Sequence, residues 1–432
     1  MATRRTATKA ASKKQWTVMV YLAGDNNLDS AGVVDLGEMK RVGSNDQINV
    51  VAQFDRSTGK GETRRFYLRK GTTLAKDALV NLGETNMGDP KVLQSFLEWG
   101  VKNYPAQRYM LVIWNHGAGW DDTNIYRTVR SELKRNVAYK GNNVAAAVRG
   151  AKGSVPISHV RAISARPLKR ALFAPTIHQA VKLRAIAFDD DAKDFLDNIE
   201  MKRVLVAAKK LFGGKLSVLG MDACLMSMVE VAYQVRDTAE VMVGSQQVEP
   251  GAGWPYHTVL KALAAKPTMT AAELGQAVVA RYLASYGANS SVTQAALNLS
   301  ASTAIEGAID KLAAVLLKAV ADSQKLFAIV RARKSAQTYE TRDYVDLLDF
   351  CRLLSKLSGD AAISQACSEV EDKGVHPFVL ASGAKGADVA KSNGVSIYFP
   401  VDTISPLYAK LDFCRNSKWN EFLAGYFAAL KA

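Results

Sequence analysis

Runs of apolar residues alternate with amphipathic segments through the first half of the chain. A run that is apolar on both faces is typical of a strand buried between two layers, whereas apolar positions three and four residues apart predict a helix. The predicted strands are 16–24, 48–55, 109–117, 215–224 and 239–245, the predicted helices include 89–104 and 225–235, and 64–71 alternates as an edge hairpin would. Strands that alternate with helices predict an α/β/α sandwich around a mostly parallel sheet.

This rhythm changes twice along the chain. Residues 123–184 have no sustained hydrophobic period, and residues 265–432 are more helical, with strands predicted at 292–300 and 394–400. A segment of this kind inside a compact domain is functional or flexible rather than part of the core. We therefore predict four regions: a basic tail at 1–15, an α/β domain formed by 16–122 and 185–264, an interrupting basic segment at 123–184, and a C-terminal α/β region at 265–432.

The net charge of +15 first suggests a nucleic-acid-binding protein, but the distribution of the charge does not. Residues 123–184 hold thirteen Lys and Arg residues and a single acid, Glu132, so this segment supplies twelve of the fifteen charges. It contains three aromatic residues and no recognisable nucleic-acid-binding module. Because the charge belongs to one segment rather than to a folded basic face, nucleic acid is not the expected partner.

The sequence indicates neither a membrane protein nor a disulfide framework. No apolar run reaches the roughly 18 residues of a membrane span, and residues 1–14 lack the apolar stretch of a secretory signal. The four cysteines match no zinc spacing and are typical of a reducing compartment or of a catalytic thiol. We therefore expect a cytoplasmic protein, and secretion by a route without a visible signal stays open.

Two reactive side chains fall at the carboxyl ends of predicted strands, where open α/β sheets bind their ligands. His116 closes the third strand, and Cys224 closes the fourth immediately before a predicted helix. Unpaired N–H groups at a helix N-terminus lower the pKa of a thiol and favour the nucleophilic thiolate. An inert core cysteine and a turn histidine are the commoner fates of these residue types. Their separation is 108 residues, or 46 without the basic segment, close to the about 50 residues between His and Cys in caspases.

Several motifs in a fixed order carry a family resemblance. They are YLAGDNNLD at 21–29, VIWNHGAGW at 112–120, AFDDD at 187–191, LGMDACLMSMVEVAYQ at 219–234, EPGAGWPY at 249–256, YVDLLDF at 344–350 and NGVSIYFP at 393–400. Together they resemble the clostripain family of cysteine peptidases, which are relatives of caspases and legumains. The resemblance covers most of 16–430 apart from the basic segment, and it implies a caspase-like form of the predicted sandwich.

The resemblance implies a cysteine endopeptidase with a His/Cys dyad. His116 takes the thiol proton, Cys224 attacks the peptide carbonyl to form an acyl-enzyme, and the backbone N–H groups of Gly117 and Cys224 form the oxyanion hole. The implied partners are proteins or peptides that are cleaved after Arg or Lys. A basic side chain requires a carboxylate in its pocket, and Asp222 matches the family's Asp-Ala-Cys block, with a helix cap as its alternative role.

The resemblance also suggests a function for the basic segment, which is processing of the chain. Members of the family are typically made as one chain and cut between the His and Cys blocks, often by themselves. A peptidase specific for Lys and Arg finds many bonds in 127–184, so we expect self-cleavage of a zymogen there. The candidate processing sites are Arg130, Lys134, Arg135 and Arg149. The alternative is a solvated insertion that is merely tolerated.

The chemistry implied by the resemblance requires no cofactor. Enzymes of the family are often calcium-dependent, and Asp189, Asp190 and Asp191 begin an acidic run that offers carboxylate oxygens to this ion. Their spacing is not that of an EF-hand, and acidic residues at a helix start are the alternative. We therefore assign no metal ligand from the sequence.

Two other functions stay open at this point. One is a catalytically silent scaffold with a caspase-like fold, although the presence of both reactive residues argues against it. The other is a nucleic-acid binder that uses the basic segment electrostatically.

Overall fold

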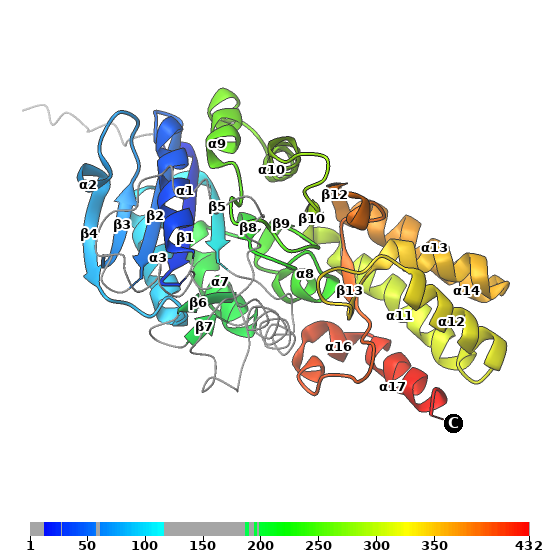
Figure 1. Cartoon of the computed structure of the whole chain (residues 1–432). Helices are drawn as coiled ribbons and strands as arrows, with labels where there is room; N and C mark the ends of the chain where they lie inside the picture. The colour runs from blue at the N-terminus through cyan, green and yellow to red at the C-terminus, as the bar shows by residue number, and fades with distance from the viewer. Residues whose placement is uncertain are drawn as a thin grey trace, which may run out of the picture.

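The computed structural model describes residues 13–26, 28–57, 61–115, 186–189, 194–196 and 198–431. Their largest feature is a nine-stranded sheet in the order β12-β10-β9-β8-β5-β1-β2-β3-β4 (Figure 1). The predicted α/β sandwich is therefore confirmed. The segment 123–184 lies outside the described residues.

The centre of the sheet is parallel. Its five strands are β2 (Ile48–Arg56), β1 (Lys14–Gly24), β5 (Ala106–Trp114), β8 (Leu216–Asp222) and β9 (Ala239–Gly244). These strands are buried on both faces, which explains their nearly continuous apolar sequences. Parallel strands also bring their carboxyl ends to one edge of the sheet, where the predicted reactive residues follow them.

Antiparallel strands complete both sides of the sheet. On one side, β3 (Thr63–Tyr67) and β4 (Ala78–Gly83) extend β2. The edge hairpin was predicted within 64–71, but that stretch supplies only one of its strands. On the other side, β10 (Val292–Asn298) and β12 (Val379–Lys385) extend β9. The C-terminal region thus supplies two strands to the same sheet as the first half of the chain.

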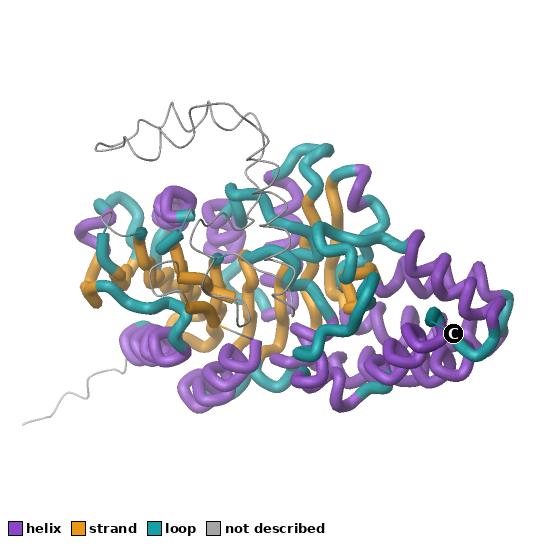
Figure 2. Tube along the Cα trace, turned by 60° about the horizontal axis from the view of Figure 1, so that its bottom comes forward, coloured by secondary structure: helices purple, strands orange, loops and turns teal. Residues whose placement is uncertain are grey.

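Helices cover the two faces of the sheet, as Figure 2 shows. Alternate residues of each strand face opposite layers, so that Val18 and Val20 of β1 pack in one core, and Met19 and Tyr21 pack in the other. The first layer is formed by α1 (Asp29–Val42), α9 (Tyr256–Ala265) and α10 (Ala271–Ser285). The second layer is formed by α3 (Pro90–Asn103), α7 (Asn198–Phe212) and α8 (Val229–Val235). Helix α11 (Ser302–Ala319) packs against α8 and against helices of the C-terminal region.

The rest of the C-terminal region extends beyond the β12 edge of the sheet (Figure 1). It contains α12 (Ser323–Ser335), α13 (Leu347–Ser358), α14 (Ala361–Glu369), α15 (His376–Phe378), α16 (Asp412–Asn416) and α17 (Trp419–Ala429). Two short strands, β11 (Tyr344–Asp346) and β13 (Ser396–Tyr398), pair antiparallel. An isolated bridge joins Ser396 to Met228, so this region contacts the segment that follows Cys224.

The remaining elements are small. Helix α2 (Leu74–Asp77) connects the strands of the edge hairpin, and β6 (Ile186–Asp189) pairs with β7 (Asp194–Leu196) as a separate ribbon. Among the described residues, no helix has both the length and the apolar character needed to span a membrane.

Candidate active site

Two neighbouring strands end side by side at the predicted site. Trp114 at the end of β5 pairs with Asp222 at the end of β8, and the Asn115 N–H donates to the Asp222 carbonyl at 3.4 Å. Asn115 is further held because its side-chain amide donates to the Ala23 carbonyl at 3.0 Å. His116 and Gly117 are the next residues along the chain, but both lie outside the described residues.

Cys224 lies in a turn, not at the end of its strand. Strand β8 ends at Asp222, and α8 begins at Val229. The prediction of a helix that starts directly after Cys224 is therefore wrong, and the thiol does not sit at a helix N-terminus. Leu225 in this turn has φ of 63°, a left-handed conformation that is costly for a side chain of its size.

A second loop supports this turn. The Glu249 N–H donates to the Cys224 Sγ at 3.3 Å, and the Leu225 N–H approaches the Gln247 carbonyl at 3.4 Å. A backbone N–H directed at a sulfur favours the thiolate over the thiol. The thiol thus has a polar contact of the kind that a helix N-terminus was expected to provide. Cys224 is 1% exposed.

Asp222 is fully buried beneath the turn. Its Oδ2 accepts a hydrogen bond from the Tyr256 hydroxyl at 2.8 Å, and the Trp254 N–H lies 3.5 Å away. Both partners belong to the EPGAGWPY block, which the sequence linked to the site without indicating how. The structure therefore joins the Asp-Ala-Cys block and this block through one carboxylate.

Trp254 packs against the sheet rather than lining an open pocket. It is 1% exposed, and a Cβ added to Gly220 would lie 2.9 Å from its ring. Gly220 lies in β8, two residues before Asp222, so the missing side chain makes room for the indole. This packing fixes the segment that holds Asp222.

Three carboxylates gather at another point of the same edge. One oxygen each of Asp25, Asp55 and Glu84 lies within 4.8 Å of the others, the one group of three metal-ligand side chains found among the described residues. Asp25 follows β1 and Asp55 lies near the end of the adjacent β2, so their proximity follows from predicted strands. Carboxylate oxygens suit calcium, but three acidic groups alone do not make a site. The calcium candidates Asp189, Asp190 and Asp191 cannot be compared with this group, because their side chains lie outside the described residues.

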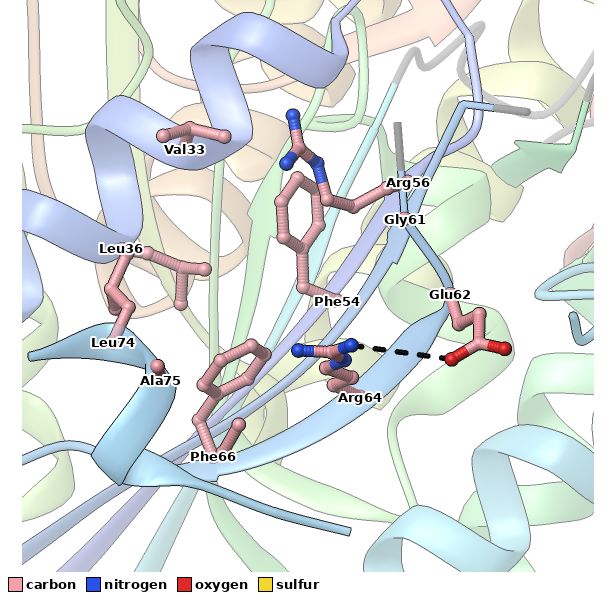
Figure 3. A pocket seen from close by; sticks show the side chains of 11 residues that line it. Val33, Leu36, Phe54, Arg56, Gly61, Glu62, Arg64, Phe66, Leu74 and Ala75 are labelled. Carbon is pink, nitrogen blue, oxygen red and sulfur yellow. Dashed lines mark ion pairs between the residues drawn. The ribbon is translucent and has the colours of Figure 1, made fainter. Parts of the chain in front are cut away.

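A pocket of about 230 Å³ lies away from Cys224, over β2 and the edge hairpin (Figure 3). Phe54, Phe66 and Leu36 form its apolar wall, and Arg56 and Arg64 lie beside them. Strands β1 and β5 separate β2 from β8 in the sheet, so this pocket is not part of the candidate active site.

Comparison with known proteins decides the family. The sequence model of the Clostripain family matches residues 20–145 and 176–426, which is most of the chain. The chain belongs to the clostripain family. The predicted family and its class, the cysteine peptidases, are thereby confirmed. The match leaves out 146–175, a stretch inside the basic segment.

A curated relative and several solved structures extend this result. Clostripain from Hathewaya histolytica is 25% identical over 269 residues, which are 56% of this chain and 41% of that protein. The match thus spans less than half of the length of the curated relative.

The solved structures share the fold. A C11 cysteine protease from Bacteroides thetaiotaomicron, described as secreted and bound to an irreversible peptide inhibitor, is 19% identical with a TM-score of 0.58, covering 95% of this chain and 99% of that one. An inactive zymogen C11 protease from Parabacteroides distasonis is 18% identical with a TM-score of 0.61, covering 94% and 99%. At these identities the similarity concerns the fold, and it agrees with the caspase-like arrangement that was expected.

One expectation is contradicted by these comparisons. The chain was predicted to be cytoplasmic because no secretory signal was visible at residues 1–14. The similar B. thetaiotaomicron protease is described as secreted, and nothing among the relatives points to the cytoplasm. The cytoplasmic prediction is therefore wrong, since the composition of the first residues was an insufficient basis for it.

Proposed function

We propose that this chain is a cysteine endopeptidase that cleaves peptide bonds after Arg or Lys, with Cys224 as nucleophile and His116 as general base. The observation that carries the proposal is the position of Cys224. It lies in a strained turn beyond β8, beside the end of β5, and a backbone N–H contacts its sulfur. Strained backbone at the carboxyl edge of a parallel sheet is typical of functional sites.

The chemistry follows from two residues on neighbouring strand ends. His116 is the residue after Asn115, whose N–H donates to the Asp222 carbonyl at the end of β8. In the proposed reaction, His116 takes the proton from Sγ, and the thiolate attacks the carbonyl carbon. The N–H groups of Gly117 and Cys224 stabilise the resulting oxyanion. The protonated histidine then gives its proton to the departing amine, and water hydrolyses the acyl-enzyme.

Asp222 supports the proposed specificity. Its carboxylate lies two residues before the nucleophile, and the Tyr256 hydroxyl orients one of its oxygens. A guanidinium or ammonium group of the residue before the cleaved bond would pair with this carboxylate. Both Asp222 and Cys224 are buried.

The second half of the proposal is activation by cleavage. We propose that one or more bonds in 127–184 are cut and that the cut opens the site. The thirteen basic residues of the segment match the proposed specificity, and Arg130, Lys134, Arg135 and Arg149 are the candidate positions. The related P. distasonis protease is described as an inactive zymogen, which is consistent with such a step.

The dyad chemistry itself uses no cofactor, and calcium dependence stays a prediction from the resemblance. Dialysis of the cleaved enzyme against EDTA tests it. Activity that is lost and then restored by Ca²⁺, but not by Mg²⁺, supports calcium dependence, whereas unchanged activity contradicts it.

The proposal is tested with fluorogenic peptides that differ in the residue before the cleaved bond. The cleaved wild type is expected to turn over Arg and Lys peptides and to leave Asp and Leu peptides intact. Cys224→Ala and His116→Ala, exposed to added trypsin to cut the segment and then freed of it, are expected to be inactive. Cys414→Ser, which changes a cysteine of α16, serves as the control and should retain activity. No turnover by the cleaved wild type would instead support a silent scaffold.

A further inference from the structure

We propose that the C-terminal region positions the nucleophile through Gln246. In this proposal Gln246, held by Asp346 and Gly394, fixes the loop whose backbone N–H contacts the Cys224 sulfur. Gln246 is then a positioning residue, because it acts through this loop and touches no reacting atom. The inference rests on the proposed role of Cys224 as nucleophile. We call residues 223–228 the nucleophile turn and residues 245–249 the support loop.

The nucleophile turn and the support loop are bonded along their length. The Ser227 N–H donates to the Ser245 carbonyl at 2.9 Å, in addition to the contact between the Leu225 N–H and the Gln247 carbonyl. The Glu249 N–H then reaches the Cys224 sulfur at 3.3 Å. The position of the support loop therefore determines the direction of the N–H group that faces the sulfur.

Gln246 ties the support loop to the C-terminal region. Its side chain is 1% exposed, and both the nitrogen and the oxygen of its amide form hydrogen bonds. Its Nε2 donates to the Asp346 Oδ2 at 3.0 Å, and its Oε1 accepts from the Gly394 N–H at 2.8 Å. Two buried hydrogen bonds from this side chain hold the loop against the C-terminal region, while the Thr293 hydroxyl accepts from the Gln246 and Gln247 N–H groups at 2.9 Å.

Gly394 bonds to both segments at once. Its N–H contacts Gln246 of the support loop, and its carbonyl accepts from the Ser227 hydroxyl of the nucleophile turn at 2.6 Å. This glycine has φ of 101°, and a Cβ would lie 2.7 Å from the Ser382 Cβ. Glycine is thus required where the two segments that surround the sulfur share one anchor.

Asp346 holds Gln246 and the segment around Gly394 in place through several hydrogen bonds. Its carboxylate is fully buried at the end of β11 and also accepts from the Asn393 N–H at 2.7 Å, the Tyr339 hydroxyl at 3.2 Å and the Asp349 N–H at 2.9 Å. Burial raises the pKa of this carboxyl, and the hydrogen bonds from Asp349, Gln246 and Asn393 oppose the shift. Because the carboxylate accepts from both Gln246 and Asn393, it fixes the support loop relative to the residue that precedes Gly394.

A displaced support loop would affect the reaction step more than substrate binding. The N–H of Glu249 stabilises the thiolate only at hydrogen-bond distance and angle. Small misplacements of catalytic groups cost one to two orders of magnitude in rate. Asp222, the carboxylate that is proposed to pair with the basic side chain of the substrate, is held by Tyr256 and not by the support loop. Binding of that side chain is therefore expected to persist.

The test compares Gln246→Met with Gln234→Met in the cleaved, full-length enzyme. Methionine keeps the length of glutamine and removes its hydrogen bonds. Gln234 of α8 is also buried, and its Oε1 accepts a hydrogen bond from the Asp412 N–H of the C-terminal region at 3.1 Å. Gln246→Met is expected to lower kcat about 10-fold with KM changed less than about two-fold. Gln234→Met should stay within about two-fold of wild type.

Alkylation of Cys224 by iodoacetamide, followed by peptide mapping at several pH values, gives a second readout. In Gln246→Met the acid limb of the alkylation profile is expected to move to higher pH, because the thiolate has lost a donor. Equal losses in both glutamine variants, or wild-type kcat and alkylation in Gln246→Met, would overturn the inference. If Gln246→Met does not fold, Ser227→Ala is judged by the same criteria, since it removes only the bond to Gly394.

The inference and the proposed function fail in different ways. An active Cys224→Ala variant refutes the nucleophile itself. An inactive Cys224→Ala together with an unaffected Gln246→Met leaves the proposed function intact and refutes only the positioning role.

Discussion

Glu230 is a buried acid just behind the nucleophile turn, near the start of α8. Its Oε1 accepts from the Tyr398 N–H at 2.9 Å and from the Tyr408 hydroxyl at 3.0 Å. Its Oε2 has no hydrogen-bond partner among the described residues. Burial raises the pKa of this carboxyl to about 7, and the hydrogen bonds only partly oppose the shift. The native state thus prefers the protonated form.

This preference predicts a pH-dependent stability. Between the ordinary value of 4.5 and about 7, the native state binds a proton that the unfolded chain has lost, so stability falls as pH rises through this window. Glu230→Gln keeps the acceptor and does not titrate. From pH 4.5 to pH 8, the free energy of unfolding of wild type should fall relative to the variant by about 3 kcal/mol. Urea unfolding at both pH values measures the difference, and parallel pH profiles would contradict it.

Tyr256 gives a prediction for specificity at the same scale. Tyr256→Phe removes the donor that orients Asp222. KM for Arg and Lys peptides is expected to rise several-fold, because a less ordered carboxylate pairs less well with the basic side chain. The variant should also lose about 1 kcal/mol of stability.

Tyr21→Phe is the matched control for this change. The buried Tyr21 hydroxyl donates to the Met87 carbonyl at 2.9 Å, away from Asp222. Its loss should cost similar stability and leave KM unchanged. Peptide kinetics on both variants decide, and an equal rise of KM in both would show that Tyr256 has only a structural role.

At the scale of elements, two glycines should respond to the same substitution in opposite directions. Gly394→Ala forces a side chain into a left-handed backbone and against Ser382, so it should destabilise the fold by about 2 kcal/mol or more. Gly307→Ala lies in α11, where a Cβ meets nothing within 4 Å, and should stabilise by about 0.5–1 kcal/mol. Chemical unfolding of both variants tests the pair, and a neutral Gly394→Ala would contradict the close packing around the anchor.

The parallel strands were predictable, whereas the nucleophile turn was not. Five buried strands have continuous apolar sequences, so their positions followed from hydrophobicity alone. The segment after Cys224 is equally apolar and was predicted as helix. Hydrogen bonds to distant residues hold the start of this segment as a turn instead. The Ser227 carbonyl accepts from the Ser396 N–H at 3.0 Å, and the Ser227 hydroxyl donates to the Gly394 carbonyl. Local sequence does not contain these partners, which lie about 170 residues further along the chain.

Strand β12 was missed for a related reason. Its sequence, VLASGAK, is partly exposed and contains small residues, so it lacks a strong period of its own. Antiparallel pairing with β10 makes it a strand. Edge strands depend on their neighbour more than on their own composition.

At the scale of the whole molecule, the structure brings together the ends of the two strands that precede the predicted site residues. Asn115 and Asp222 come together because β5 and β8 are adjacent parallel strands. The sequence did not predict the contacts that run from Cys224 through Gln246 to Asp346, because they join three segments that are separated along the chain. The C-terminal region therefore contributes two strands to the sheet and a base for the support loop.

The most direct test of the central claim is mass spectrometry of the purified full-length protein, comparing wild type with Cys224→Ala. A cysteine peptidase specific for basic residues, with Cys224 as nucleophile, should cut its own chain within 127–184 on the carboxyl side of Lys or Arg. Cys224→Ala should remain a single uncut chain under the same incubation. Both chains intact, both cut alike, or wild-type cuts after residues other than Lys and Arg would contradict the account.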